Sequence, residues 1–242
     1  MLIALVGFIG SGKDTTGRHL VETHGFKDLA FADALKDALC AIFGWDRELI
    51  DGKTPQSREW RNRVDLWWAR RLNIPHFTPR WAMQNVGTDC LRKHLHDDLW
   101  IARVEREIDQ INLGLEYSHI VVTDGRFPNE LDMVRARGGK VVRVRRGDEP
   151  DWYKHARIAN LKYRKGADYL SEIADLGLAG VSSAVISEMM VQATDELSER
   201  GIHVSEYAWI GYRMDAIVEN DATLDELFNR ADLAIGLESH GR

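Results

Sequence analysis

A glycine-rich loop directly after an apolar run is the feature that most restricts how this chain folds. Leu2–Val6 is a short, continuous apolar run bounded by glycine, which is typical of a strand buried on both faces of a parallel sheet. The loop GFIGSGKDTT follows at Gly7–Thr16, and residues Gly12 to about His24 favour a helix. A strand, a glycine loop with a lysine and a helix in this order predict a phosphate-binding loop of the type G-x-x-x-x-G-K-[ST].

The chemistry of this loop favours nucleotide phosphates. Gly7, Gly10 and Gly12 allow backbone N–H groups to point at phosphate oxygens, and the following helix adds its positive end. Lys13 is expected to bridge the terminal phosphates. The simpler alternative is a glycine-rich turn with a surface lysine, which the strand–loop–helix context disfavours.

Asp14 stands where such loops usually carry the hydroxyl that binds magnesium. GTPases and motor ATPases use that hydroxyl directly on the metal, so this loop belongs to another class. Adenylate kinases carry a threonine one place later, as Thr15 is here, and the loop therefore indicates a kinase for a small phosphorylated acceptor. Alternatively, Asp14 only caps the helix, because a carboxylate is stabilised in the first turn.

A kinase with a phosphate monoester as acceptor needs no general base, since that phosphate is largely dianionic at neutral pH. It needs arginines and magnesium to offset repulsion between two polyanions. The predicted strand His119–Thr123 ends at Asp124, and Arg126 follows. A carboxylate at this tip of a parallel strand faces the ligand crevice, so we expect Asp124 to hold magnesium through waters and Arg126 to reach a phosphate. An Asp-Gly turn is the alternative.

The segment RWAMQNVGTD lies in a predicted helix, Trp81–His96, that begins after Arg80. Arg80, Gln84 and Gly87 share one face by their spacing and offer a phosphate ligand, an amide able to read a base edge, and a gap for close approach. Arg92 lies one turn past Thr88. Met and Trp at helical spacing are also typical of a core helix, so this segment alone is a weak signal.

Alternation of strands and helices predicts a parallel α/β sheet. The other elements that the pattern predicts are strands at 28–31, 140–145 and 216–218, and helices at 33–43, 58–72, 98–113, 128–137, 181–197 and 224–231. We expect one domain over 1–242. Its core comprises 1–44, 115–150 and 204–242, with an acceptor-binding helical insertion at 45–114 and a second helical insertion at 151–203.

Composition excludes several classes of protein. The formal net charge is -6, so nucleic acid is not expected as a partner, because its phosphates require a basic surface. Cys40 and Cys90 have no CxxC partner and indicate reduced thiols rather than a disulfide scaffold or a zinc site. The N-terminal apolar run is too short for a signal peptide or a membrane span, so we expect no membrane partner.

Segments distributed over about half the chain resemble the bacteriophage deoxynucleoside monophosphate kinases. In chain order, the segments are GFIGSGKDT, RWAMQNVGTD, VVTDGRFPNELDMVRARGGKVVRVRR, HVSE and ENDATLDELF. The second of them is followed by Arg92 and by the tripeptide DLW at 98–100. The resemblance implies a P-loop nucleoside monophosphate kinase-like three-layer fold with about five parallel strands. It also implies ATP as donor, Mg2+, a deoxynucleoside monophosphate as acceptor, and the cytoplasm as location (of the host, for a phage-encoded chain).

The resemblance also implies roles for residues. The residues that would hold ATP are Gly7, Gly10, Ser11, Gly12, Lys13, Asp14, Thr15 and Thr16 at the phosphates, with Asn220 and Asp221 near adenine. The residues at the transfer centre would be Lys13, Asp124, Arg126 and Arg146. The acceptor side would comprise Arg80, Gln84, Thr88, Asp89 and Arg92, together with Asp33 and Lys36. Asp124 would hold the metal through waters, and Asp14 is a second candidate for it.

The chain departs from the family pattern at 151–203, where the phage enzymes have a much shorter connection. The insertion is expected to serve packing or a homodimer surface. Three rivals stay open: another P-loop small-molecule kinase such as a dephospho-coenzyme A kinase, a nucleic-acid-stimulated ATPase, and a catalytically silent nucleotide-binding module. The base preference is not set by the sequence.

Overall fold

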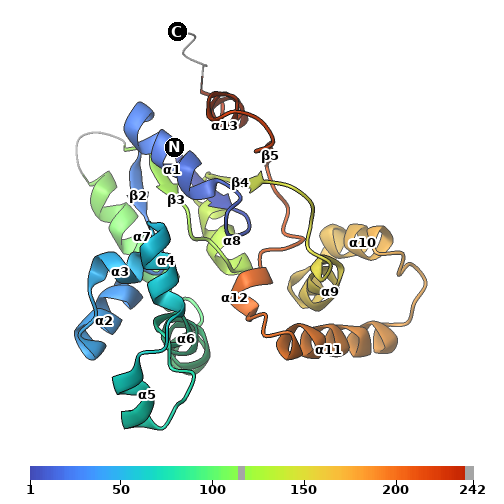
Figure 1. The fold of residues 1–242 in the computed structure, drawn as a ribbon. Coiled ribbons are helices and arrows are strands. Elements are labelled where there is room, and N and C mark those ends of the chain that lie inside the picture. The colour runs from blue at the N-terminus through green and yellow to red at the C-terminus, as the bar shows by residue number, and fades with distance from the viewer. Residues whose placement is uncertain (114–117, 238–242) are drawn as a thin grey trace. The chain divides into compact units, whose positions relative to one another are not determined.

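The computed structural model describes residues 1–113 and 118–237, which divide into two compact units. The first unit consists of Met1–Asp28 and Ser118–Arg242, and the second consists of Leu29–Tyr117. Figure 1 shows their elements. In the described residues, no helix is both long enough and apolar enough to cross a membrane.

A five-stranded sheet is assembled from the described residues in the order β2-β3-β1-β4-β5. Its strands are β1 (Leu2–Val6), β2 (Lys27–Leu29), β3 (Ile120–Val122), β4 (Lys140–Arg145) and β5 (Ala216–Glu219). The pairs β1–β3, β1–β4 and β4–β5 are parallel, which confirms the predicted sheet. Ala4 lies opposite Val122, so the segments that follow β1 and β3 leave the sheet at the same edge.

Helices cover both faces of this sheet and complete the three layers. Alternate residues of a strand point to opposite faces. Ile3 and Leu5 therefore share a face, and they join one core cluster with Leu20 of α1 (Lys13–His24) and Leu227 of α13 (Leu224–Ile235). The opposite face, to which Val6 points, contacts α8 (Pro128–Ala136). The predicted three-layer α/β architecture is thus confirmed.

Residues 151–203, for which the sequence predicts a second insertion, contain several helices. Their elements, with the short helix that follows, are α9 (Tyr153–Ala159), the 3-10 helix η2 (Asn160–Tyr163), α10 (Gly166–Asp175), α11 (Ser183–Glu199) and α12 (Val204–Tyr207). α9 packs along α11, and the buried Asn160 donates to the carbonyls of Tyr207 (2.8 Å) and Ile210 (2.9 Å). These hydrogen bonds join the insertion to the chain that leads into β5.

The second unit is wholly helical in its described part apart from the end of β2. Its helices are α2 (Asp33–Phe43), α3 (Arg47–Asp51), α4 (Pro55–Asn62), α5 (Leu66–Leu72), α6 (Pro79–Gln84), the π-helix η1 (Asn85–Leu95) and α7 (Leu99–Asn112). Two apolar clusters hold them together, one around Leu39 and Ile50 and one around Phe77.

Two predicted helices differ from those observed. The single helix expected at 58–72 is wrong: Arg63 ends α4 in an extended conformation, and the Asp65 carboxylate accepts from the N–H groups of Trp67 and Trp68 to start α5. Such a cap satisfies N–H groups that a helix start leaves unpaired. The helix expected at 81–96 exists, but at Asn85 it changes from α to π.

Candidate active site

The loop between β1 and α1 is closed by glycines at positions where any other residue would be strained. Gly7 and Gly12 have φ angles of 150° and 104°, a region that L side chains rarely adopt. A Cβ on Gly7 would lie 2.4 Å from the carbonyl oxygen of Val144, and one on Gly12 would lie 2.5 Å from Nδ2 of Asn220. The positive φ angles and the close approach of the Val144 carbonyl and the Asn220 side chain therefore favour glycine at both ends of the loop.

Two hydroxyls of this loop are buried without a hydrogen-bond partner in the part of the chain that the structure describes. They are Oγ of Ser11 and Oγ1 of Thr16, whose residues are 4% and 0% exposed. Buried polar atoms are normally paired with protein or with a bound group. The two hydroxyls suit a loop that receives oxygen-rich ligands.

Lys13 and Asp14 form an ion pair at the start of α1. Nζ of Lys13 lies 3.2 Å from Oδ1 of Asp14, and the two side chains are 14% and 60% exposed. The aspartate stands in the first helical turn, where its charge is stabilised by the helix dipole. Asp14 therefore supplies the counterion of the loop lysine in this structure, while Thr15 beside it is half-buried.

The strand end after β3 and the phosphate loop line one pocket within the first unit. Its walls are Gly7, Phe8, Ile9, Lys13, Asp124, Gly125, Arg126, Glu206 and Trp209. The pocket thus brings together the loop lysine, the strand-end carboxylate and an arginine, as the parallel register of β1 and β3 requires. Glu206 and Trp209 follow the insertion, and only the HVSE segment pointed to that region in the sequence.

Hydrogen bonds hold both the guanidinium group and the backbone N–H of Arg126. Its guanidinium Nη1 donates to the carbonyl of Ser205 (3.0 Å) and lies 3.3 Å from Oε2 of Glu206. Its backbone N–H donates to Oε2 of Glu130 (2.7 Å), which also accepts from the N–H of Phe127 (3.0 Å). Glu130 is only 3% exposed. It is a positioning residue that the sequence analysis missed, although Pro128 and an acid two residues later are a helix-start signal.

Phe8 anchors the phosphate loop in an aromatic cluster. Its ring meets those of Trp209 at 5.0 Å, Trp152 at 5.5 Å and Tyr153 at 6.2 Å, in edge-to-face geometry. The buried guanidinium of Arg143 stacks over Trp209 at 5.1 Å and donates to the hydroxyl of Tyr153 at 3.0 Å. The start of the second insertion is thereby packed against the loop.

The segment after β5 also contacts the loop. Nδ2 of Asn220 donates to the carbonyl of Ser11 at 2.8 Å, whereas Asp221 pairs with Arg230 of α13 at 2.6 Å. Hydrogen bonding from Arg230, and then its charge, lower the pKa of the Asp221 carboxyl. Arg146 follows β4 and is exposed. Asn220 thus shares the loop region, and Arg146 lies outside the pocket lining.

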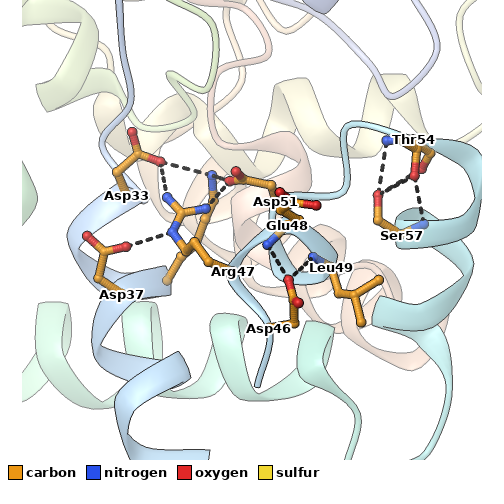
Figure 2. A network of polar contacts seen from close by, with 10 residues as sticks. Asp33, Asp37, Asp46, Arg47, Glu48, Leu49, Asp51, Thr54 and Ser57 are labelled. Carbon is orange, nitrogen blue, oxygen red and sulfur yellow. Dashed lines mark hydrogen bonds and ion pairs between the residues drawn. The ribbon is translucent and has the colours of Figure 1, made fainter. Parts of the chain in front are cut away.

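In the second unit, Asp33 and Lys36 belong to an ion-pair network centred on Arg47. Figure 2 shows Asp33, Asp37 and Asp51 around Arg47. Arg47 contacts the carboxylates of Asp33 (2.8 Å), Asp37 (2.6 Å) and Asp51, and Nζ of Lys36 lies 3.0 Å from Asp51. Burial raises the pKa of Asp51, but hydrogen bonds from Arg47 and Lys36 outweigh burial and hold that pKa below its ordinary value. This network ties α2 to α3.

The remaining predicted acceptor residues lie on α6 and η1. Nε of Arg80 donates to Oδ1 of Asn62 at 2.7 Å, and the buried Arg92 reaches Asp97 at 3.4 Å. A Cβ on Gly87 would lie 2.5 Å from Leu35, so the expected gap at this glycine is filled by a neighbouring helix. The half-buried residues are Gln84 and Thr88, and the exposed one is Asp89. A π-helix is rare and frequently marks a functional site.

A family model and two related proteins that match this chain all carry the name deoxynucleotide monophosphate kinase. The family model of deoxynucleotide monophosphate kinase matches residues 62–172. A protein of Acanthamoeba polyphaga mimivirus, named provisionally as a deoxynucleotide monophosphate kinase, is 31% identical over 153 residues, which cover 60% of this chain and 74% of that protein. The deoxynucleotide monophosphate kinase of Enterobacteria phage T4 is 25% identical over 227 residues, covering 68% of this chain and 89% of the phage protein.

Similar solved structures include two kinases of small molecules. The shikimate kinase from Aquifex aeolicus has a TM-score of 0.38 and 14% identity, over 98% of this chain and 96% of that one. The dephospho-CoA kinase from Campylobacter jejuni has a TM-score of 0.37 and 15% identity, over 97% and 95%. The fold described above rests on its own strand order. With 31% identity across 74% of the mimivirus protein, the chain belongs to the deoxynucleotide monophosphate kinase family.

Proposed function

We propose that this chain transfers the terminal phosphate of ATP to a deoxynucleoside monophosphate, giving the diphosphate for DNA precursor synthesis, in the cytoplasm where ATP is available. The single observation that carries the proposal is the pocket shared by Lys13, Asp124 and Arg126. Family membership supports the same reaction and disfavours the rival kinases and the ATPase.

On the donor side, backbone N–H groups of the loop and the positive end of α1 bind the phosphates. Lys13 exchanges its ion pair with Asp14 for the phosphate oxygens. Arg126, held by Glu130, contacts the transferred group and offsets the charge that develops on it. Asn220 fixes the loop from the side on which we place adenine.

The residues present suit Mg2+, a hard cation that prefers oxygen ligands and retains several waters. Asp124 offers a carboxylate in the pocket, and the loop hydroxyls of Ser11 and Thr16 are buried and unpaired within the described residues. We propose that Asp124 holds the ion through waters, with Asp14 as a second carboxylate nearby. When bound, Mg2+ would neutralise charge on the phosphates of ATP.

For the acceptor, we propose Arg80 and Arg92 as phosphate ligands and Gln84 as the group that reads the base, with Thr88 and Asp89 beside them. Asp33 and Lys36 are proposed to shape the entrance at the start of α2, held in place by Arg47. The acceptor phosphate attacks without a general base, because it is already largely dianionic at neutral pH.

A homodimer is a separate proposal. α11 carries exposed apolar residues, Val185 (47%) and Val191 (61%), within the predicted insertion 151–203. Light scattering of the purified chain tests it: a mass of twice 27.6 kDa supports the dimer, and the single-chain mass excludes it.

The enzymatic proposal is tested by a substrate panel. The purified chain is incubated with ATP and Mg2+ and, in turn, with each of four deoxynucleoside and four ribonucleoside monophosphates, and ADP and diphosphate products are separated by chromatography. We expect turnover on at least one deoxynucleotide. Binding of ATP without turnover on every member would identify a silent nucleotide-binding module instead.

A further inference from the structure

Two histidines and one aspartate converge on a single point of the first unit, away from the residues of the proposed reaction. His19 and His24 lie on α1, and Asp232 lies on α13. Nε2 of each histidine is 3.0 Å from Oδ1 of Asp232, and the three donor atoms all lie within 4.8 Å of one another. The exposed fractions of the side chains are 10% for His19, 11% for His24 and 7% for Asp232, so all three are largely shielded from solvent.

We propose that this cluster binds one transition-metal ion, with Zn2+ as the natural occupant. Two imidazole nitrogens and a carboxylate are a donor set typical of Zn2+, which adds water as a fourth ligand. Metal–ligand bonds of about 2.0–2.1 Å in tetrahedral geometry separate the ligand atoms by about 3.4 Å. The observed 3.0 Å separations need to widen only slightly for the ion to enter.

The orientation of the His19 ring is fixed by contacts other than the one with Asp232. Nδ1 of His19 lies 3.1 Å from the hydroxyl of Thr23, and the ring stacks on Phe228 at 4.2 Å with an interplanar angle of 4°. Metal-binding histidines usually hydrogen-bond through the second ring nitrogen, which sets the tautomer and aims the first nitrogen at the ion. His19 has this arrangement, with Thr23 as its outer partner.

The imidazole nitrogens of this site are softer donors than the oxygens of the magnesium site proposed at Asp124. Imidazole nitrogen favours Zn2+ and its neighbours in the first transition series, whereas Mg2+ prefers oxygen and water. The ion would join the last two turns of α1 to α13. α1 begins at Lys13 of the phosphate loop, and α13 follows the segment whose Asn220 is hydrogen-bonded to that loop. The bound ion would therefore connect the two helices that extend from the phosphate loop and from this segment.

The test is a titration of the intact, chelator-treated chain with ZnCl2, without nucleotide and with excess Mg2+ to fill oxygen-rich sites. Calorimetry should give one ion per chain, and Co2+ in its place should give the intense visible absorption of a tetrahedral site. At 100 times the dissociation constant, Zn2+ should raise Tm by about 5–10 °C. Failure of wild-type protein to bind, or a Co2+ spectrum of octahedral type, overturns the proposal.

Variants locate the ion. His24→Gln and Asp232→Asn should each weaken binding more than about 100-fold, since loss of an outer partner alone costs 10–100-fold. Thr23→Val, which removes only that partner, should weaken it about 10-fold. The matched control is His155→Gln, which removes a histidine paired with Glu196 at 3.0 Å elsewhere in the same unit.

The control should bind Zn2+ as wild type does. Circular dichroism establishes that each variant is folded, and His24→Gln carries the test where Asp232→Asn does not fold. Unchanged affinity in a folded His24→Gln variant would place the ion elsewhere and overturn the proposal.

Discussion

Glu130 offers the sharpest test of how the strand-end loop is built. Its carboxylate is 3% exposed and accepts from the N–H groups of Arg126 at 2.7 Å and Phe127 at 3.0 Å. A hydrogen bond to a charged group contributes about 1.5–3 kcal/mol to stability. Two such bonds predict that Glu130→Ala lowers the free energy of unfolding by about 3–6 kcal/mol.

The same change should reduce activity, because the loop that carries Arg126 loses its attachment to α8. A displacement of about 1 Å at a transfer centre can cost about 100-fold in rate. We expect kcat to fall at least tenfold while KM for ATP changes little, since the glycine loop contributes most of ATP binding. Activity is measured below the melting range, where the variant is folded.

The matched control is Glu130→Gln, whose amide oxygen can still accept both N–H groups. It loses the charge and replaces the other carboxylate oxygen by an NH2 group, so about 2 kcal/mol of stability should disappear and most of the activity should remain. Urea unfolding followed by circular dichroism gives both free energies. A loss below 1 kcal/mol for Glu130→Ala, with an unchanged dependence on urea, would refute the role assigned to this carboxylate.

The other predictions concern the proposed reaction. Lys13→Ala should abolish transfer and leave the circular dichroism spectrum unchanged, because only bound phosphate needs its charge; unaltered turnover would remove the phosphate-loop function. Asp124→Asn should lower kcat more than Asp14→Asn, since Asp124 lines the pocket and the Asp14 side chain is 60% exposed; the reverse order would make Asp14 the principal magnesium ligand. Arg80→Ala should lower kcat on every acceptor. Gln84→Ala should raise KM for the best acceptor and flatten the ranking of four deoxynucleotides by about 1–3 kcal/mol; an unaltered ranking with unmoved KM values would place Gln84 outside the site.

The sheet and the phosphate loop were predictable because their signals are local. β1 and β4 are continuous apolar or alternating runs ended by glycine or charge, and α1 begins directly after Gly12. Thr223 caps α13 by a local contact, because its hydroxyl accepts from the N–H of Glu226 at 3.3 Å. In each case, the residues that determine the element are close neighbours in the chain.

Features that depend on capture of backbone N–H groups by side chains, or on a change of helix type, were not predictable from the hydrophobic pattern. Asp65 interrupts an otherwise helical run because its carboxylate captures two local N–H groups, a competition that periodicity does not register. The π-helix after Gln84 has more residues per turn than an α-helix. The α-helical spacing used for the prediction therefore placed Gly87 on the wrong face. Glu130 lies in the first turn of α8 and is buried, where its carboxylate accepts from the N–H of Arg126.

The aromatic anchor at Phe8 has a consequence for the entropy of nucleotide binding. Three rings hold Phe8, whereas Ile9 next to it is 58% exposed and Gly10 is also exposed. Fixing the backbone of one residue costs about 1–2 kcal/mol. Because these ring contacts fix the Phe8 end of the loop, we expect ATP binding to restrict fewer backbone torsions, chiefly those around Ile9 and Gly10. Replacing Phe8 with alanine should leave ATP to order the Phe8 segment as well, while Asn220 still holds Ser11. The weaker binding would be visible as a more unfavourable entropy in calorimetry.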